Sequence, residues 1–378
     1  MENAVIGNII SSGDLLKDHA VVYNDNMIVD LCPAKKIESG NTIKNIKNFG
    51  ENYISAGFID LQINGADGKL FQFDLKSLHN IESVIQQTGT CYYLPAISAT
   101  DLEEYRSIRN AVRDSFNDLN GMLGIHYEGP YLNEKKPGFG QKECIGQEII
   151  DYKDIYGDLI EEMVIMMTIA PEGVKDSYAR GMIKDGVKLS LGHSNATLPE
   201  TKRLIDIGVR SATHIFNGMP AISGRAPGIT TACLINENII CSIIADGYHI
   251  SPDIIKLIAM VKGIENINLI SDGMPTIKSK NKVFSYRDNE IKLIENKLVD
   301  KNGTLSGTDK PILEMLEKFC KYLNLPVQNA IDVVTRNPAK TIGLSENIGD
   351  IKIGMTPSFT VFSKDFLPVT VICKKKYL

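Results

Sequence analysis

The sequence predicts an α/β protein: a (β/α)8 TIM-like barrel with a small β-sandwich domain made from both chain termini. From residue 57 onward, short apolar segments of strand length alternate with helical patterns, which is typical of parallel strands joined by crossover helices. Eight such segments can be counted, and eight is the number that closes a barrel. The two ends of the chain instead carry short alternating segments separated by turn residues, which predict small antiparallel strands and a hairpin.

The predicted barrel strands are eight apolar segments that are followed by polar or small residues. They are residues 57–63, 91–95, 122–127, 163–169, 187–191, 210–213, 239–245 and 267–270. We expect the barrel to span residues 57–344 and the small β domain to combine residues 1–56 with residues 345–378, because chain termini often lie close together. After the second strand, Thr100 and Glu103 predict a capping box at the start of a helix.

The chain changes texture after the eighth strand. Residues 278–302 are rich in Lys and Asn. Polar and apolar residues alternate within this segment, which predicts a hairpin outside the barrel. Helices are expected from about residue 311 and again from about residue 327. Residues 348–378 return to alternating strands with turn glycines between them.

Composition excludes several classes of protein. The 378 residues are 43% hydrophobic and 23% charged, which is ordinary for a soluble globular protein. The net charge of −5, with Lys and Arg scattered, gives no footprint for nucleic acid. No apolar run approaches the roughly 18 residues that cross a membrane, and the start lacks the positive region of a signal peptide. Seven cysteines without a C-x-x-C pair argue against a disulfide framework. We expect a cytoplasmic protein with a small-molecule partner.

Polar side chains follow the predicted strands at the point where each strand ends. His193 and His214 end two consecutive strands, and parallel strands place such residues side by side. Convergent imidazoles indicate metal binding or proton transfer. The alternative for either histidine alone is a helix cap or a buried polar contact. Because active sites of these barrels lie at the carboxyl ends of the strands, one mouth would gather the other strand-end polar residues as well: Gln62, Asn64, Glu128, Asn217, Asp246, His249 and Asp272.

Seven motifs in order carry a resemblance to a known family. They are residues 57–65, 124–130, 192–197, 213–220, 224–228, 245–249 and 271–272. Over nearly its whole length the chain resembles the N-acetylglucosamine-6-phosphate deacetylases of the amidohydrolase superfamily. The resemblance implies metal-dependent hydrolysis of the acetamide of N-acetylglucosamine 6-phosphate, giving glucosamine 6-phosphate and acetate in amino-sugar catabolism.

The resemblance also implies a metal site made by Glu128, His193 and His214. Two imidazoles and one carboxylate leave an open position for water, as in hydrolytic zinc sites. Many members of the superfamily hold a second metal with a His-x-His pair, where this chain has Gln62-Ile63-Asn64. Amides bind zinc poorly, so Gln62 and Asn64 are expected to form hydrogen bonds to water or to neighbouring groups and to belong to the substrate-binding residues. We expect one divalent ion per chain, with Zn²⁺ as first choice and Fe²⁺, Mn²⁺ or Co²⁺ as alternatives.

By the same resemblance, Asp272 is the catalytic acid and base; out of context it would be read as a helix N-cap. The resemblance places the sugar phosphate against Asn217, Gly218, Arg225 and His249, in a pocket completed across a homodimer interface. Arginine suits a phosphate because its planar fork donates two parallel hydrogen bonds. The alternative for Arg225 is a solvated surface charge. His126 is expected to support the site and not to bind the metal.

Two segments depart from the family pattern. The family usually has a histidine in the loop after the Glu-Gly-Pro motif, but no histidine lies between His126 and His193. Either Gln141 or Lys142 substitutes, or the substrate differs, or activity is weak. Residues 308–311 also differ, beside the expected sugar site. The alternatives are therefore a deacetylase of another N-acetylhexosamine or its phosphate, hydrolysis of another amide, or a weakly active or non-catalytic sugar-phosphate-binding protein.

Overall fold

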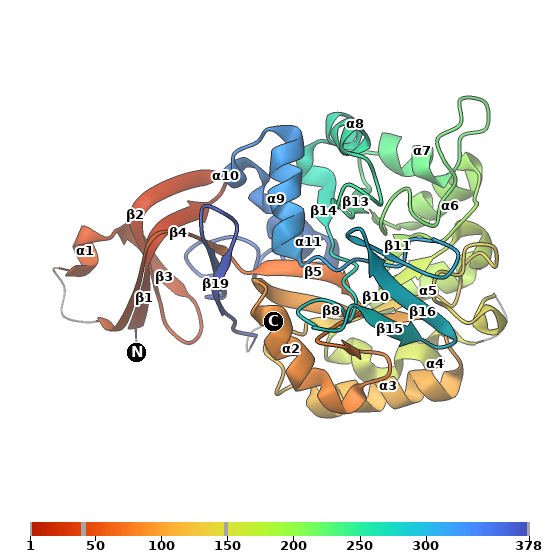
Figure 1. The fold of residues 1–378 in the computed structure, drawn as a ribbon, viewed down its shortest axis with the longest axis horizontal. Helices are drawn as coiled ribbons and strands as arrows, with labels where there is room; N and C mark the ends of the chain where they lie inside the picture. The colour runs from red at the N-terminus through yellow and green to blue at the C-terminus, as the bar shows by residue number, and fades with distance from the viewer. Residues whose placement is uncertain (1, 39–42, 147–149, 376–378) are drawn as a thin grey trace.

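A computed structural model of the protein describes residues 2–38, 43–146 and 150–375. A barrel of parallel strands surrounded by helices forms the larger part, and a sheet built from both chain ends lies beside it (Figure 1). The predicted fold class is confirmed. The division into residues 1–56, 57–344 and 345–378 stays a proposal.

The barrel has the eight strands that the hydrophobic pattern predicts, in sequence order around the sheet. They are β5 (Phe58–Ile63), β8 (Thr90–Ser98), β9 (Gly124–Glu128), β10 (Val164–Ile169), β11 (Lys188–Leu191), β12 (Ser211–Ala212), β13 (Ile240–Ile243) and β14 (Ile267–Leu269). The first strand meets the segment after the last one at the mouth. There the Asn64 amide donates to the Gly273 carbonyl at 2.7 Å, and the Asp272 amide donates to the Gln62 carbonyl at 3.0 Å.

Helices cover the outside of the barrel and bury their apolar faces against it (Figure 1). They are α2 (Leu78–Gln86), α3 (Leu102–Ser115), α4 (Tyr152–Tyr156), α5 (Asp176–Asp185), α6 (Leu198–Ile207), α7 (Ile229–Ile235), α8 (Pro252–Lys262), α9 (Ile312–Leu323), α10 (Val327–Ala330) and α11 (Arg336–Ile342). The predicted capping box at Thr100 and Glu103 is wrong by one residue. Asp101 caps α3 by accepting from the Glu104 amide at 2.8 Å. Thr100 is fully buried and bonds elsewhere.

The chain ends meet in one six-stranded sheet, in the order β19-β18-β4-β1-β2-β3. Its strands are β1 (Glu2–Ser11), β2 (Asp14–Tyr23), β3 (Ile28–Pro33), β4 (Ile43–Ala56), β18 (Phe359–Phe362) and β19 (Pro368–Ile372), with the short helix α1 (Lys35–Glu38) between β3 and β4. β1 and β4 pair in parallel, unlike the antiparallel pairing expected for this region. Alternate side chains of β1 enter two separate apolar clusters, which is why both faces of the sheet are covered.

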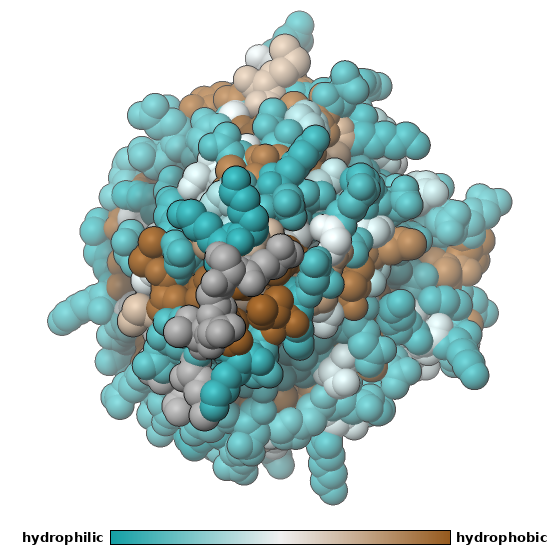
Figure 2. Space-filling view, turned by 90° about the vertical axis from the view of Figure 1, so that its left-hand side faces the viewer, coloured by the Kyte–Doolittle hydropathy of each residue, from teal (hydrophilic) through white to brown (hydrophobic). Residues whose placement is uncertain are grey.

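The end of the molecule formed by this sheet is mostly hydrophilic, with smaller apolar areas on the same face (Figure 2). Among the described residues, no helix combines the length and apolar character that a membrane span needs.

Residues 278–302 form more than the expected hairpin. β15 (Val283–Tyr286), β16 (Asn289–Ile294) and β17 (Lys297–Val299) make a three-stranded antiparallel sheet, here called the cover sheet. β15 and β16 lie across the front of the barrel in Figure 1. A further short pair, β6 (Gly65–Ala66) and β7 (Lys69–Leu70), follows the first barrel strand.

Candidate metal centre and its cavity

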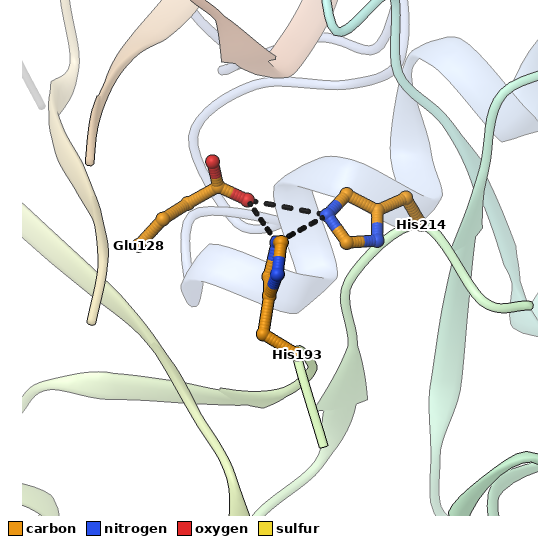
Figure 3. Close-up of side chains that lie close together, drawn as sticks. All are labelled: Glu128, His193 and His214. Atoms are coloured by element: carbon orange, nitrogen blue, oxygen red, sulfur yellow. Dashed lines mark hydrogen bonds and ion pairs between the residues drawn. The ribbon is translucent and has the colours of Figure 1, made fainter. Parts of the chain in front are cut away.

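Glu128, His193 and His214 converge on one point at the mouth of the barrel (Figure 3). Glu128 ends β9, while the two histidines follow β11 and β12. Glu128 Oε1 lies 3.4 Å from His193 Nε2 and 3.2 Å from His214 Nε2, and the two Nε2 atoms are 3.1 Å apart. The structure thus brings together the three residues expected from the sequence; their role as metal ligands stays a prediction.

The backbone at these strand ends adopts a conformation that few residues take. His193, His214 and Asp272 have φ values of 47°, 27° and 46°, in the left-handed region that disfavours residues with a Cβ. Such conformations persist when the surrounding structure fixes them, and they cluster at functional sites. Here the sharp change of direction accompanies the turn of each strand end toward the cavity.

A backbone carbonyl holds the ring of His193 in place through Nδ1. Its Nδ1 lies 2.9 Å from the backbone carbonyl of Lys136, which accepts a hydrogen bond and so places the ring proton on Nδ1. Nε2 is the ring nitrogen that faces Glu128. A carbonyl behind a ring nitrogen in this way is the usual support of a metal-binding histidine.

The three donor atoms fit a divalent ion. Donors at about 2.0–2.2 Å from a zinc ion lie roughly 3.3 Å from one another in tetrahedral geometry, which matches the three separations here. Two ring nitrogens and a carboxylate oxygen also satisfy the ligand preferences of zinc and related metals. The donor set therefore suits a single bound metal.

The electrostatics of the cluster favour positive charge at the same point. Burial alone would raise the pKa of Glu128, but the two imidazoles hold it well below its ordinary value. Burial would lower the pKa of His214, yet the Glu128 carboxylate raises it. Each shift reports attraction between the carboxylate and a cation, which is the attraction that a metal ion would satisfy.

Asp272 lies beside the cluster and is held by two amides. Its Oδ1 accepts from Asn64 Nδ2 at 2.8 Å and from Gln62 Nε2 at 3.3 Å. Gln62 Nε2 also donates to Glu128 Oε1 at 2.8 Å, so one amide links the two carboxylates. Burial and the Glu128 charge raise the pKa of Asp272. A carboxyl group with a raised pKa suits proton transfer near neutral pH.

His249 is oriented by a second carboxylate. Its Nδ1 lies 2.8 Å from Asp246 Oδ2, while Asp246 Oδ1 accepts from the amides of Tyr248 and His249 at 2.8 and 2.9 Å. Burial would raise the pKa of Asp246, but the His249 contacts lower it. Since Nδ1 is engaged, the other ring nitrogen of His249 is the one available to a ligand.

A cavity of about 640 Å³ opens over the cluster, a size that accepts small-molecule ligands. Its lining includes seven of the residues expected at the site: Glu128, His193, His214, Asn217, Gly218, His249 and Asp272. Gln62 and Asn64 are not among the described lining residues, but both donate hydrogen bonds to Asp272, which lines the cavity. Arg225 is absent from the described residues that line the cavity and is exposed on the loop before α7.

The expected substitutes for the missing loop histidine lie elsewhere. Lys142 is exposed, and Gln141 contacts Thr100 at 3.1 Å. Neither is among the described lining residues of the cavity. His126 is fully buried between the Leu61 carbonyl and the Thr168 hydroxyl, and burial lowers its pKa to about 4. It is therefore a neutral buried histidine, and its supporting role stays a prediction.

Several lining residues did not emerge from the sequence. Lys136 and Phe139 come from the loop after β9, while Asn289 and Ile291 come from the cover sheet. Lys136 is the only lysine or arginine among the described residues of the lining. The Lys-Lys-Pro-Gly run in this loop was a usable signal for Lys136. No local signal marks the cover sheet residues, because their place depends on how the sheet docks.

Comparison with known proteins identifies the family. The profile of the amidohydrolase family matches residues 53–376. The chain belongs to the amidohydrolase family. Amidohydrolases are metal-dependent, which agrees with a Glu/His/His cluster at the barrel mouth of this amidohydrolase.

Its relatives include two deacetylases of different sugar phosphates. The N-acetylglucosamine-6-phosphate deacetylase of Haemophilus influenzae is 30% identical over 100% of this chain and 99% of its own. The N-acetylgalactosamine-6-phosphate deacetylase of Shewanella sp. is 30% identical over 92% of this chain and 88% of its own. The crystal structure of N-acetylglucosamine-6-phosphate deacetylase from Pasteurella multocida is similar with a TM-score of 0.91 and 28% identity, over 99% of this amidohydrolase and 98% of that chain.

Proposed function

We propose that this amidohydrolase hydrolyses the acetamide of N-acetylglucosamine 6-phosphate, giving glucosamine 6-phosphate and acetate in amino-sugar catabolism. The observation that carries the proposal is the convergence of Glu128, His193 and His214 in a cavity that also holds Asp272. The substrate is supported by the similar Haemophilus and Pasteurella proteins, which are N-acetylglucosamine-6-phosphate deacetylases.

Glu128, His193 and His214 would hold one divalent ion, with Zn²⁺ as first choice. The ion would polarise the acetamide carbonyl and lower the pKa of a water molecule. Gln62 and Asn64 support a single ion because amide side chains are poor zinc ligands and both direct their NH₂ groups at the carboxylates of the site.

Asp272 moves the proton in this mechanism. Its carboxylate accepts a proton from the attacking water and later gives it to the nitrogen of the sugar, which leaves as an amine only when protonated. Gln62 and Asn64 donate to Oδ1 and thereby hold the carboxylate in one orientation.

Asn217, Gly218, His249 and Arg225 would bind the sugar phosphate. The first three line the cavity, and Asp246 fixes the ring of His249. Arg225 would reach the cavity of a second subunit, since its own chain leaves it on an exposed loop. We therefore propose a homodimer with the phosphate pocket near the interface.

Exposed apolar side chains near that loop support the dimer. Ile222 is 46% exposed, Ile235 at the end of α7 is 58% exposed and Met260 on α8 is 84% exposed, and α7 contacts α8. Exposed apolar groups of this kind mark protein–protein contacts. We also propose a cytoplasmic location, which the seven free cysteines fit.

A second substrate is favoured by one specific observation. The Shewanella N-acetylgalactosamine-6-phosphate deacetylase has the same sequence identity to this chain, 30%, as the Haemophilus enzyme. The two sugars differ only in the configuration of one hydroxyl, so the same metal site would serve both.

The test is a panel of N-acetylhexosamines assayed for acetate, with metal content measured on the same sample. We expect one divalent ion per chain and a kcat/KM for N-acetylglucosamine 6-phosphate about a hundredfold above that for the unphosphorylated sugar, because charge-assisted hydrogen bonds hold the phosphate. A preference for the galactosamine epimer would support the second substrate. Binding of the sugar phosphate by metal-loaded protein without acetate release would show a binding protein instead.

A further inference from the structure

The cover sheet forms one wall of the cavity. It is an insertion that follows the eighth barrel strand in the sequence. Asn289 and Ile291 of β16 line the cavity. Ile291 is fully buried and packs with Leu298 and Met274, against which Phe139 also packs. The shape of the substrate site therefore depends on where the cover sheet docks.

Arg287 joins the cover sheet to the opposite side of the mouth. It lies in the turn between β15 and β16, and its Nη2 donates to both carboxylate oxygens of Glu104, at 2.9 and 3.0 Å. The same nitrogen donates to Thr100 Oγ1 at 3.0 Å, and the guanidinium lies 5.2 Å from the ring centre of Phe73. Phe73 and Thr100 follow the first two barrel strands, so the contact bridges the start and the end of the barrel.

The environment strengthens this ion pair. The side chains of Arg287 and Glu104 are 27% and 22% exposed, so water screens the charges less than at an open surface. Gln141 adds to the contact: with its amide turned so that both its atoms are satisfied, its oxygen accepts from Arg287 Nη1 at 2.7 Å. Four neighbours, Glu104, Thr100, Phe73 and Gln141, thus contact one guanidinium.

A second contact joins the cover sheet to the loop after β9, on the cavity wall. The ring of Tyr286, next to Arg287, lies 4.5 Å from the ring of Phe139, which lines the cavity. The preceding glycine, Gly138, lies against the ring of His193, where a Cβ would come within 2.6 Å of Cε1. Docking of the cover sheet thus positions Phe139 in the wall of the cavity.

We propose that Arg287 is a positioning residue: its contact with Glu104 and Phe73 holds the cover sheet closed and sets the wall that binds the substrate. The kinetic test of this inference rests on the proposed function, because KM and kcat are measured from acetate release. We assign to the ion pair a role in substrate affinity and none in the chemical step, since Arg287 is absent from the described residues that line the cavity.

The kinetic test compares Arg287→Met with Lys292→Met as a matched control. Lys292 lies on the same sheet, forms an ion pair with Glu290 and is half exposed. It takes no part in the contact between Arg287 and Glu104. For Arg287→Met we expect KM to rise about tenfold while kcat changes less than threefold, because the binding that is lost is equal in the ground state and the transition state. Metal content should stay at the wild-type value. Arg287→Lys should recover part of the lost substrate affinity, because lysine keeps the positive charge but lacks the planar guanidinium that donates two parallel hydrogen bonds.

Glu104→Gln supplies a second route if Arg287→Met folds poorly, because it keeps the shape and removes the charge. In the double variant we expect no further rise in KM beyond that of Arg287→Met, since both substitutions break one contact. Additive effects of the two substitutions, an unchanged KM, or an equal effect of Lys292→Met would each overturn the proposal.

Hydrogen exchange separates this proposal from the proposed function. In metal-loaded protein without substrate, the amides of residues 283–299 should exchange at least about tenfold faster in Arg287→Met than in wild type, because opening of the sheet becomes more frequent. Hydrogen exchange can be measured whether or not the wild-type protein releases acetate. Unchanged exchange in the cover sheet would overturn the role of Arg287, while absent acetate release in wild type with faster exchange in the variant would overturn only the proposed function.

Discussion

The Nε2 atoms of His193 and His214 lie 3.1 Å apart, and both face Glu128 Oε1. The Lys136 carbonyl accepts from Nδ1 of His193, so Nε2 is the ring nitrogen that faces the carboxylate. The three donor atoms are thus spaced as the ligands of a single divalent ion. The relationship therefore predicts dependence on metal for both activity and stability.

Removal of the metal should abolish acetate release and lower thermal stability, because binding to the folded state alone stabilises it by mass action. Dialysis against a chelator followed by metal analysis, calorimetry and an acetate assay checks both effects. Readdition of one equivalent of Zn²⁺ should restore them. Full activity in a sample shown to hold less than about a tenth of an equivalent of metal would contradict the assignment.

Asp272→Asn should lower kcat by about 100- to 10,000-fold, because the amide cannot relay a proton. The metal content should stay unchanged, since the three proposed ligands are intact. Asp253→Asn is a matched control, as the Asp253 side chain is 89% exposed on α8. A variant that keeps more than about a tenth of the wild-type kcat would show that another group moves the proton.

Asp246→Asn should raise KM for the sugar phosphate about tenfold, because His249 loses the carboxylate that orients its ring. The effect on kcat should be smaller. Steady-state kinetics with phosphorylated and unphosphorylated sugar checks this, since the loss should be largest for the phosphorylated one. An equal loss for both sugars would place His249 away from the phosphate.

Asp350 should make stability depend on pH. Burial would raise the pKa of Asp350, but Lys352, the Ser12 amide and Arg336 outweigh it and lower the pKa to about 2. Because the folded pKa lies below the unfolded one, the charged carboxylate stabilises the fold above about pH 4, and this contribution is lost as pH falls toward 2. Asp350→Asn should therefore cost about 2 kcal/mol of unfolding free energy at pH 7.

Urea unfolding of Asp350→Asn and wild type at pH 7, 4 and 3 checks this dependence. The difference between them should narrow mainly below pH 4, and the exposed Asp365→Asn should give no such trend. A difference that stays constant from pH 7 to pH 3 would contradict the role of the Asp350 charge.

The barrel and the strand-end residues could be predicted from the sequence because both follow local rules. Apolar segments such as 187–191 must be buried, and the residues that end parallel strands must share one mouth, so Glu128, His193 and His214 meet without knowledge of any loop. The start of α3 was misplaced by one residue because Thr100 and Asp101 are both good caps, and the choice between them rests on the burial of Thr100 beside Arg287.

What the sequence did not predict depends on contacts between distant segments. The parallel pairing of β1 with β4 is set by how the sheet assembles and not by the pattern of either strand. The cover sheet was expected only as a hairpin, because its docking rests on Arg287 meeting Glu104 and Tyr286 meeting Phe139. Arg225 lies on a loop whose partner, in the proposed dimer, is another chain.

Mixing two inactive variants tests that last point directly. If Arg225 serves the partner's cavity, Arg225→Met and Asp272→Asn damage cavities through different subunits of the dimer. A mixed dimer then contains one cavity with both residues intact, so subunit exchange at equal amounts should restore about a quarter of wild-type activity. Arg225 serving its own cavity predicts no recovery, because every cavity would then contain one damaged residue. Activity measured before and after exchange, with the dimer followed by analytical ultracentrifugation, distinguishes the two arrangements.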